Sequence, residues 1–322
     1  MKIAAVVSVY NEEKNIAKLI DIILKQTRLP EEIIIVDDGS FDKTAVIAKS
    51  YVKNNPIIKY LYQDNRGPAA GRNRGWNESS ADICAFTDGD CLPEENWIEE
   101  IIKPFSDPVI GATGGAYKTL NSQKLLARFI GLEIDWRYYN KKEIKAHGAY
   151  NLAVRKNILK EVGGFNEEYP KASGEDWDLT YKISKKHKII FVPSAIVGHY
   201  HPEKFWSYMK NQARRAYDRV KIYKDHPEMK KGDNYTGGII KYQIVASGLF
   251  IPSCALIYPF FRFSYIIPIA IFLFLILSAF ISFPYLWKKD KLAAIYGVFV
   301  QLARNFAWLF GLVRGIVKYG IA

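Results

Sequence analysis

The first forty residues, MKIAAVVSVYNEEKNIAKLIDIILKQTRLPEEIIIVDDGS (1–40), decide the class of fold. Two short runs rich in β-branched residues, 2–9 and Glu32–Val36, have the composition of buried strands. Between them, apolar side chains recur at helical spacing from Ile16 to Leu24, which predicts a helix with Asn11 as its cap. Strand, helix and strand in this order predict a βαβ unit in a parallel sheet.

The alternation of strands and helices continues to about residue 90 and then becomes mixed. No Gly-x-Gly-x-x-Gly follows the first strand, so the pattern indicates a Rossmann-like α/β half-domain that does not bind a dinucleotide. We predict further strands at Ile57–Tyr62, Asp82–Thr87, Val109–Tyr117 and Lys188–Val192, and helices at Asp42–Lys53, Gly67–Ser79, Ser122–Lys141 and Glu203–Lys224.

Composition narrows the possible partners. Of the 322 residues 49% are apolar and 24% charged, which excludes wholesale disorder. The net charge of +12 suits nucleic acid, lipid head groups or a phosphorylated substrate, and no nucleic-acid module accompanies it. Three scattered cysteines are too few for a disulfide framework or a zinc site. No signal peptide is recognised, so we expect the catalytic part in the cytoplasm, with no obligatory protein partner.

From Ile239 onward the chain is nearly continuous hydrocarbon. Segments 239–261 and 264–287 are each long enough to span a bilayer, and the lysines that follow should be cytoplasmic. Arg304 and Arg314 interrupt the last segment, so 292–317 is either a third span, which we favour, or an interfacial helix. We therefore expect a catalytic domain at 1–230 and a membrane region at 239–321. The basic amphipathic helix 203–224 would lie at the bilayer interface or pack on the enzyme core.

Two acidic motifs follow predicted strands. In Thr87-Asp-Gly-Asp90, two carboxylates flank a glycine and could share Mg²⁺ or Mn²⁺, although an ordinary turn has the same residues. In Val36-Asp-Asp-Gly-Ser40, Asp38 could accept hydrogen bonds from a base or ribose, and helix capping is the alternative.

Four other segments carry groups suited to phosphates, protons or metals. Asn65–Gly75 is a glycine-rich basic turn that could present Arg72 to an anion. Gly174–Asp178 crowds three carboxylates, one of which could act as a general base. Gly198-His-Tyr-His201 offers imidazoles as metal ligands or phosphate contacts, although a lone histidine is more often structural. Gln212–Arg215 offers paired arginines for a pyrophosphate, and a surface or lipid-facing role is equally open for them.

Taken in order, these motifs resemble the family 2 glycosyltransferases of the GT-A fold over roughly residues 1–220. The resemblance rests on Val9-Tyr-Asn-Glu-Glu13, Val36-Asp-Asp-Gly-Ser-x-Asp42, Gly67-Pro-x-x-x-Arg72-Asn-x-Gly75, Asp88-Gly-Asp90, Gly163-Gly-Phe-Asn-Glu167 and Glu175-Asp176. Each motif is weak alone, but the ordered set is specific.

The resemblance implies a role for each matching residue. The donor nucleotide would be held by Val9, Tyr10, Glu12, Asp38, Arg72, Asp88 and Gly89, with Asp38 on the base and Asp88 on the ribose or sugar. Asp90 would hold Mn²⁺ or Mg²⁺, with His199 or His201 completing the coordination. Asp176, paired with Glu175, would deprotonate the acceptor hydroxyl for an inverting attack, and Gln212 with Arg215 would brace the donor diphosphate.

The resemblance also limits the acceptor. Family members that glycosylate polyprenyl phosphate usually carry an Arg-x-x-Gly-x-Ser-Lys segment, which this sequence lacks. The retained Glu-Asp pair instead favours a hydroxyl on a membrane lipid or lipid-linked sugar, with GDP-mannose or a UDP-hexose as donor. Polyprenyl phosphate remains the alternative acceptor, and an inactive sugar-nucleotide-binding scaffold is the alternative that is not an enzyme.

Overall fold

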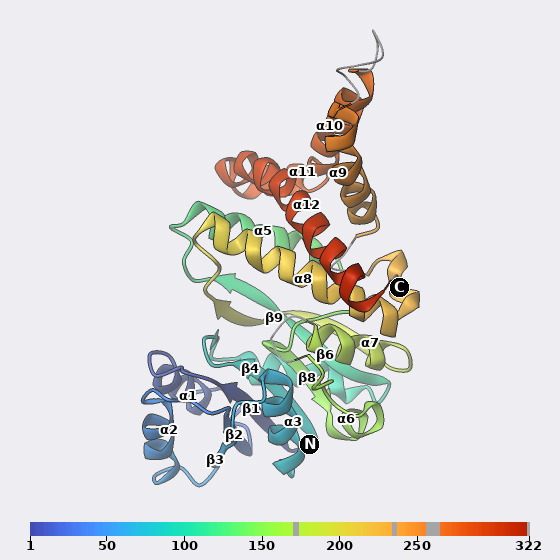
Figure 1. Cartoon of the computed structure of the whole chain (residues 1–322). Helices are drawn as coiled ribbons and strands as arrows, with labels where there is room; N and C mark the ends of the chain where they lie inside the picture. Colours follow the sequence, from blue (N-terminus) through green and yellow to red (C-terminus); the bar gives the residue numbers. More distant parts are fainter. Residues whose placement is uncertain (170–173, 234–236, 256–264, 321–322) are drawn as a thin grey trace. The chain divides into compact units, whose positions relative to one another are not determined.

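The computed structural model describes residues 1–169, 174–233, 237–255 and 265–320. By internal packing the chain divides into two units (Figure 1), which we call the sheet unit (Met1–Leu120 with Asn140–Tyr200) and the helical unit (Asn121–Tyr139 with His201–Ala322). Residues 121–139 and 203–224, expected to fall within a catalytic domain at 1–230, therefore pack with the C-terminal helices. That 1–230 acts as the catalytic domain stays a prediction.

The sheet unit is built on one mixed sheet, with strand order β3-β2-β1-β4-β8-β6-β9-β5 and β7 paired to β9. The first four strands in this order are parallel, as predicted, whereas β8 is antiparallel to both of its neighbours. The strands are β1 (Ile3–Val9), β2 (Glu32–Asp37), β3 (Ile58–Tyr62), β4 (Ile83–Asp88), β5 (Leu92–Pro93), β6 (Ile110–Thr119), β7 (Glu143–Ile144), β8 (Asn151–Arg155) and β9 (Lys188–His199).

Helices cover both faces of the parallel strands. The helices of the sheet unit are α1 (Ile16–Leu24), α2 (Thr44–Val52), α3 (Pro68–Glu78), α4 (Trp97–Ile102), α6 (Lys156–Val162) and α7 (Glu175–Ser184). Odd-numbered side chains of β1, such as Val7, join the apolar core beneath α1. Even-numbered ones, such as Val6, face α3, because successive side chains of a strand point to opposite faces.

The approach of α3 to the sheet depends on small residues. A Cβ on Gly71 would lie 2.2 Å from the Ser8 hydroxyl, and one on Gly75 would lie 2.4 Å from a Val6 methyl carbon. These two glycines therefore let α3 lie directly on β1, which fixes where the neighbouring Arg72 points.

The predicted cap of α1 was wrong. Asn11 lies outside the helix with φ 56°, and its side-chain oxygen accepts a hydrogen bond from the Phe41 N–H instead. Helix α1 begins only at Ile16, with Asn15 at the N-cap position. Asn11 therefore joins the ends of β1 and β2, because asparagine tolerates a left-handed backbone better than most residues do.

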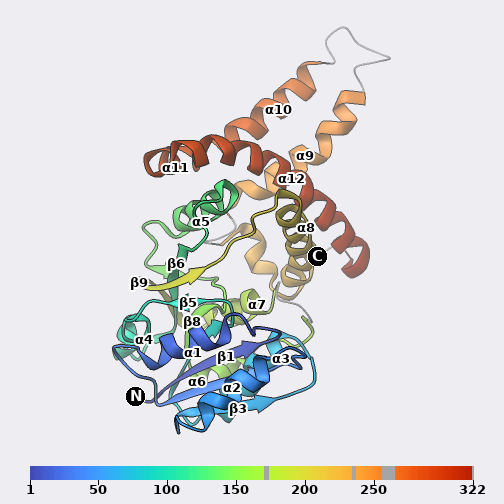
Figure 2. The same cartoon turned by 90° about the vertical axis from the view of Figure 1, so that its left-hand side faces the viewer.

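The helical unit consists of α5 (Leu125–Tyr138), α8 (Phe205–Asp225), α9 (Ile239–Ala255), α10 (Ile266–Ala279), α11 (Phe283–Lys289) and α12 (Lys291–Tyr319). Its apolar core joins α5, α8, α11 and α12, with Phe129, Met209, Leu286 and Val300 among the buried side chains. Helices α9 and α10 lie side by side (Figure 2).

Among the described helices, α12 alone is both long and apolar enough to cross a membrane by itself. Helices α10 and α11 meet the same criterion only as a pair, bent by 46° at the break between them. Helix α9 is apolar but shorter, and the end of the predicted span 239–261 lies outside the described residues. The number of membrane passes stays a prediction.

Candidate active site

The predicted donor-binding motifs meet at one edge of the sheet. Val9 is paired with Asp37, and Ser8 with Asp88, so β1, β2 and β4 end at the same level. The residues that follow these strands therefore share the carboxyl edge, where ligands bind in open α/β sheets. Val9 itself is buried beneath this edge, whereas the ring of Tyr10 is exposed and meets Phe41 edge-on, with 6.1 Å between ring centroids.

Three carboxylates crowd this edge. A Cβ on Gly89 would lie 2.7 Å from the side chain of Glu12, so a glycine is needed between Asp88 and Asp90 for the strand end to approach Glu12. Burial raises the pKa of Glu12, and the charges of Asp90 and Asp88 raise it further. The edge therefore favours the binding of a cation, which would relieve this repulsion.

Asp90 also belongs to a group of potential metal ligands in the described part of the chain. Ligand atoms of Asp90, Cys91 and His199 all lie within 4.8 Å of one another, and Asp90 Oδ2 is 3.8 Å from His199 Nε2. This separation suits two ligands of one divalent ion, each at about 2.1 Å. Burial raises the pKa of the Cys91 thiol well above its ordinary value, and Asp88 and Asp90 add to the shift. The donor set that fits Mn²⁺ or Mg²⁺ is therefore Asp90 with His199.

A buried ion chain links this edge to α7. Arg72, 4% exposed, donates to Asp88 Oδ1 (2.7 Å) and to Glu175 Oε1 (2.9 Å). Burial disfavours charge on Arg72, but Asp88 and Glu175 outweigh it and raise the pKa of the guanidinium. Glu175 also accepts the Gly174 N–H at 3.0 Å. Two motifs 103 positions apart are thereby held together by one cation.

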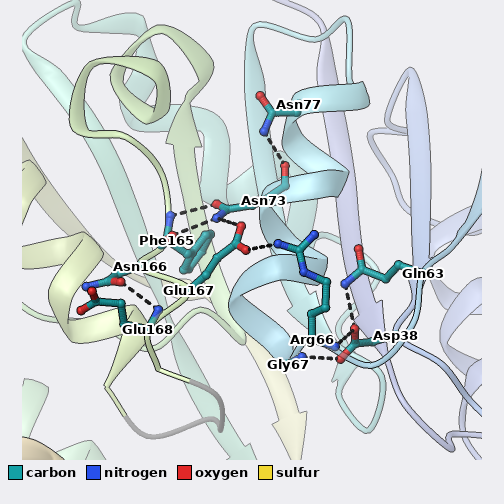
Figure 3. A network of polar contacts seen from close by, with 10 residues as sticks. All are labelled: Asp38, Gln63, Arg66, Gly67, Asn73, Asn77, Phe165, Asn166, Glu167 and Glu168. Atoms are coloured by element: carbon teal, nitrogen blue, oxygen red, sulfur yellow. Dashed lines mark hydrogen bonds and ion pairs between the residues drawn. The ribbon is translucent and has the colours of Figure 1, made fainter.

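Asp38 organises the turn before α3 (Figure 3). Its carboxylate accepts hydrogen bonds from the Gln63 amide (2.7 Å) and from the backbone N–H groups of Arg66 (2.9 Å) and Gly67 (2.8 Å). Asp38 is only 3% exposed. Its carboxylate thus positions the glycine-rich turn, and the expected contact with a base stays a prediction.

The Gly163–Glu167 motif serves the same turn. Glu167 accepts hydrogen bonds from Asn73 (2.9 Å) and Arg66 (2.7 Å), and Asn73 also holds the backbone of Phe165 (Figure 3). These contacts fasten the segment after α6 to α3, and the Phe165 ring of this segment lies 5.5 Å from the guanidinium of Arg72.

The predicted base lies at the start of α7. Asp176 is half-buried and accepts the N–H of Trp177 at 2.8 Å, while its charge adds to those that favour the guanidinium of Arg72. Asp178 is buried and pairs with Lys182 at 2.6 Å. Of the acidic triplet, Glu175 is thus tied to Arg72, and Asp176 is the member that stays partly accessible.

Three predicted site residues belong to the helical unit. Gln212 is buried and accepts a hydrogen bond from the Trp308 indole at 3.0 Å, whereas Arg215 is exposed on α8. His201 is buried, with its backbone bonded to Asn121. Their predicted roles toward the diphosphate and the metal are not decided by these contacts.

Sequence reasoning missed several residues of the site. Cys91 was set aside as one of three scattered cysteines, Phe41 stands at the unspecified position of the Val36–Asp42 motif, and Gln63 was passed over in a stretch expected to be a loop. Long-range pairs such as Arg72 with Glu175 have no local signal.

Known proteins share the sequence pattern and the fold of this chain. Residues 4–161 match the profile described as glycosyl transferase family 2. Glycosyltransferase AglE of Haloferax volcanii is 26% identical over 69% of this chain and 74% of its own length. The probable glycosyltransferase YdaM of Bacillus subtilis is 26% identical over 67% of this chain, which spans only 54% of that relative.

Solved structures show the same fold. A mannosyltransferase from Pyrobaculum calidifontis, solved with GDP-Man and Mn²⁺, superposes with a TM-score of 0.65 at 17% identity, covering 99% of this chain and 88% of the other. GalNAc-T7, solved with UDP, GalNAc and Mn²⁺, gives 0.54 at 18% identity, covering 72% and 51%. The sheet unit therefore has the GT-A fold of nucleotide-sugar-dependent glycosyltransferases. The chain belongs to glycosyltransferase family 2.

Proposed function

We propose that this enzyme transfers a hexose from a nucleoside diphosphate sugar to a hydroxyl of a membrane lipid or lipid-linked sugar, with inversion at the anomeric carbon. The observation that carries the proposal is the ion chain Asp88–Arg72–Glu175. It connects the edge that carries the donor motifs to the first turn of α7, so that Asp176 stands beside the residues assigned to the donor.

The donor would bind along the carboxyl edge. The exposed ring of Tyr10 offers a stacking surface for a base, and Asp38 holds the turn that leads to Arg72. Val9, Glu12, Asp88 and Gly89 form the floor of this edge. The GDP-Man and UDP complexes of the two structural neighbours support a nucleoside diphosphate donor, and GDP-mannose or a UDP-hexose are our candidates.

Asp90 and His199 would hold Mn²⁺ or Mg²⁺, for which His201 is the other candidate ligand. Such an ion neutralises charge that develops on the diphosphate leaving group. Arg72 cannot replace it, because its guanidinium is already shared between Asp88 and Glu175.

Asp176 would act as the general base. It takes the proton of the acceptor hydroxyl as the acceptor oxygen bonds to the anomeric carbon and the bond from that carbon to the diphosphate oxygen breaks. A single displacement of this kind inverts the anomeric centre. Glu175 would keep Arg72 in place and leave the proton transfer to its neighbour.

The apolar helices α9 and α10 would enter the bilayer and keep the catalytic part at the cytoplasmic face. A lipid-borne acceptor would then be supplied at high local concentration. Gln212 and Arg215, in the helical unit, would brace the diphosphate.

The test is transfer by full-length protein in vesicles of a total lipid extract, with radiolabelled GDP-mannose and UDP-hexoses. Asp176→Asn should lower turnover by about 10²–10⁴-fold with little change in donor affinity. Asp107→Asn is the control, because Asp107 precedes β6 at the opposite edge of the sheet. Loss of nucleotide affinity in Asp176→Asn would place this residue in the donor site. A product labile to mild acid would identify polyprenyl phosphate as the acceptor, and binding without transfer or donor hydrolysis would support the scaffold.

A further inference from the structure

Helices α8 and α12 run parallel, with contacts along nearly all of α8 and from Phe299 to Tyr319 of α12. Successive contacts advance in step along both helices. They join Phe205 to Phe299, Tyr208 to Arg304, Gln212 to Trp308, Ala213 to Gly311, Val220 to Gly315 and Lys224 to Tyr319. Two glycines of α12 allow the closest approach, since a Cβ on Gly311 would lie 2.0 Å from the Ala213 carbonyl oxygen. Whatever direction α12 takes relative to a membrane, α8 takes as well.

The polar residues in the middle of α12, Gln301, Arg304 and Asn305, are buried within the helical unit. Arg304, 4% exposed, makes two hydrogen bonds to Glu133 of α5 (2.5 and 2.8 Å) and one to the Tyr208 hydroxyl (3.2 Å). Gln301 is buried on the same side. Arg304, one of the two arginines that interrupt this apolar segment, is therefore paired inside the helical unit.

The outward face of α12 carries an apolar stripe, with the exposed Arg314 at its edge, where the guanidinium lies 5.6 Å from the Phe310 ring. Its exposed side chains recur every three or four residues near both ends, which places them on one stripe: Leu292, Ile295, Phe299, Phe310, Val313 and Val317. The middle of that stripe is covered by α9, where Phe306 meets Phe250 and Leu309 meets Gly248. The hairpin of α9 and α10 thus packs on the same face that α12 exposes on either side.

A spanning orientation conflicts with the composition of α8. This helix carries six basic side chains, Lys210, Arg214, Arg215, Arg219, Lys221 and Lys224, with Arg214 and Arg215 exposed near its middle. Its 21 residues measure about 31 Å, close to the hydrocarbon thickness of a bilayer. If α12 spanned the membrane, α8 would carry these charges through the hydrocarbon, where basic residues are strongly disfavoured.

We propose that α12 is an in-plane membrane helix whose apolar stripe docks on the surface of a lipid bilayer. Only α9 and α10 then enter the hydrocarbon. Helix α8 lies against the side of α12 that faces the protein, with its basic residues at the level of the head groups. Trp287 of α11 and Lys291, whose ammonium lies 5.7 Å from the Trp287 ring, have the amphipathic character of residues at a bilayer interface. The inference rests on the membrane association in the proposed function.

Depth and sidedness can be measured on the full chain in sealed vesicles. In a Cys254→Ser background the remaining cysteines, Cys84 and Cys91, are buried. Single substitutions Ile295→Cys, Phe310→Cys and Val317→Cys place a fluorophore at both ends and near the middle of α12. Leu277→Cys on α10, 67% exposed, and Val46→Cys on α2, 71% exposed, are the controls for lipid and water.

We expect all three α12 positions to be quenched by lipids spin-labelled near the head group, and more weakly by lipids labelled deep in the chain. An impermeant thiol reagent should reach Ile295→Cys and Val317→Cys from the same side of the vesicle. Leu277→Cys should be quenched best by the deep label, and Val46→Cys by neither.

Two results would overturn this inference and leave the proposed function intact. In the first, Phe310→Cys is quenched best by the deep label and the two ends of α12 are labelled from opposite sides of the vesicle. In the second, the α12 positions behave like Val46→Cys while Leu277→Cys is quenched by lipid. If Leu277→Cys is itself not quenched, the membrane association in the proposed function fails.

Discussion

Replacing Arg72 by leucine should destabilise the sheet unit by about 4 kcal/mol, mainly through Glu175. The side chain of Glu175 is 2% exposed, and removal of one partner of a buried ion pair costs about 3–5 kcal/mol because the other charge stays uncompensated. Asp88 adds at most about 1 kcal/mol, since its side chain is 32% exposed and water reaches it.

The exposed pair Arg66–Glu167 is a matched control. Its atoms are 2.7 Å apart, but the side chains are 64% and 39% exposed, so Arg66→Leu should cost about 1 kcal/mol or less. Hydrogen exchange of β1 and β4 amides in the full chain reports on the sheet unit alone. A loss of 4 kcal/mol lowers protection about 10³-fold, since each 1.4 kcal/mol is tenfold.

The double variant Arg72→Leu with Glu175→Met separates charge from packing. It should recover most of the protection, because apolar replacement of a whole buried pair is often neutral. The reasoning is refuted if Arg72→Leu and Arg66→Leu lose protection equally, or if the double variant is less protected than Arg72→Leu.

Two other perturbations test separate parts of the sheet unit. Asp90→Asn should abolish transfer without loss of amide protection, because Asp90 is the proposed metal ligand and is partly exposed rather than part of the core; EDTA should do the same to the wild type, and full activity in excess EDTA would contradict a metal requirement. His147 is fully buried, and burial lowers the pKa of its imidazole to about 4 from an ordinary 6.5, despite the facing carbonyl oxygens of Gly148 and Gly115. The folded state therefore favours neutral His147. The contribution of His147 to the free energy of unfolding is complete above pH 6.5 and is lost as the pH falls toward 4, by roughly 3 kcal/mol in all. In the His147→Gln variant, amide protection should no longer show this fall between pH 6.5 and 4. An unchanged pH profile would show that another group is responsible.

The parallel half of the sheet was predictable because each strand is a continuous buried run. Residues Ile33–Val36, for example, are completely buried, and such runs in alternation with helices leave few other arrangements. Strand β8 was missed, since Asn151–Arg155 is short and has no turn signal around it. Strands β5 and β7, of two residues each, exist only through pairing with β9.

The sequence was sufficient to predict that the motifs meet at the carboxyl edge of the sheet. Motifs placed at strand ends had to converge, because β1, β2 and β4 are parallel and in register. The pairing of Arg72 with Glu175 could not be predicted from the sequence, because it depends on where α7 packs against the sheet. The amphipathic pattern of α8 likewise did not reveal that α12 covers its apolar face, because the partner of an apolar face is decided by packing between distant segments.

The bond between Glu133 and Arg304 has a consequence for biosynthesis. Its partners are 171 positions apart, and at about 5–20 residues per second the ribosome needs roughly 10–30 s to pass from one to the other. During that interval α5 and α8 exist without the helix that completes them, whereas the sheet unit, finished by Tyr200, can already fold. Helices α9 and α10 emerge in the same interval, when Glu133 can pair with Arg137 of its own helix, 3.3 Å away in the finished fold, but not yet with Arg304. A nascent chain stalled before α12 would thus present a folded sheet unit attached to an unfinished helical unit, which is the kind of species that chaperones and quality-control proteases recognise.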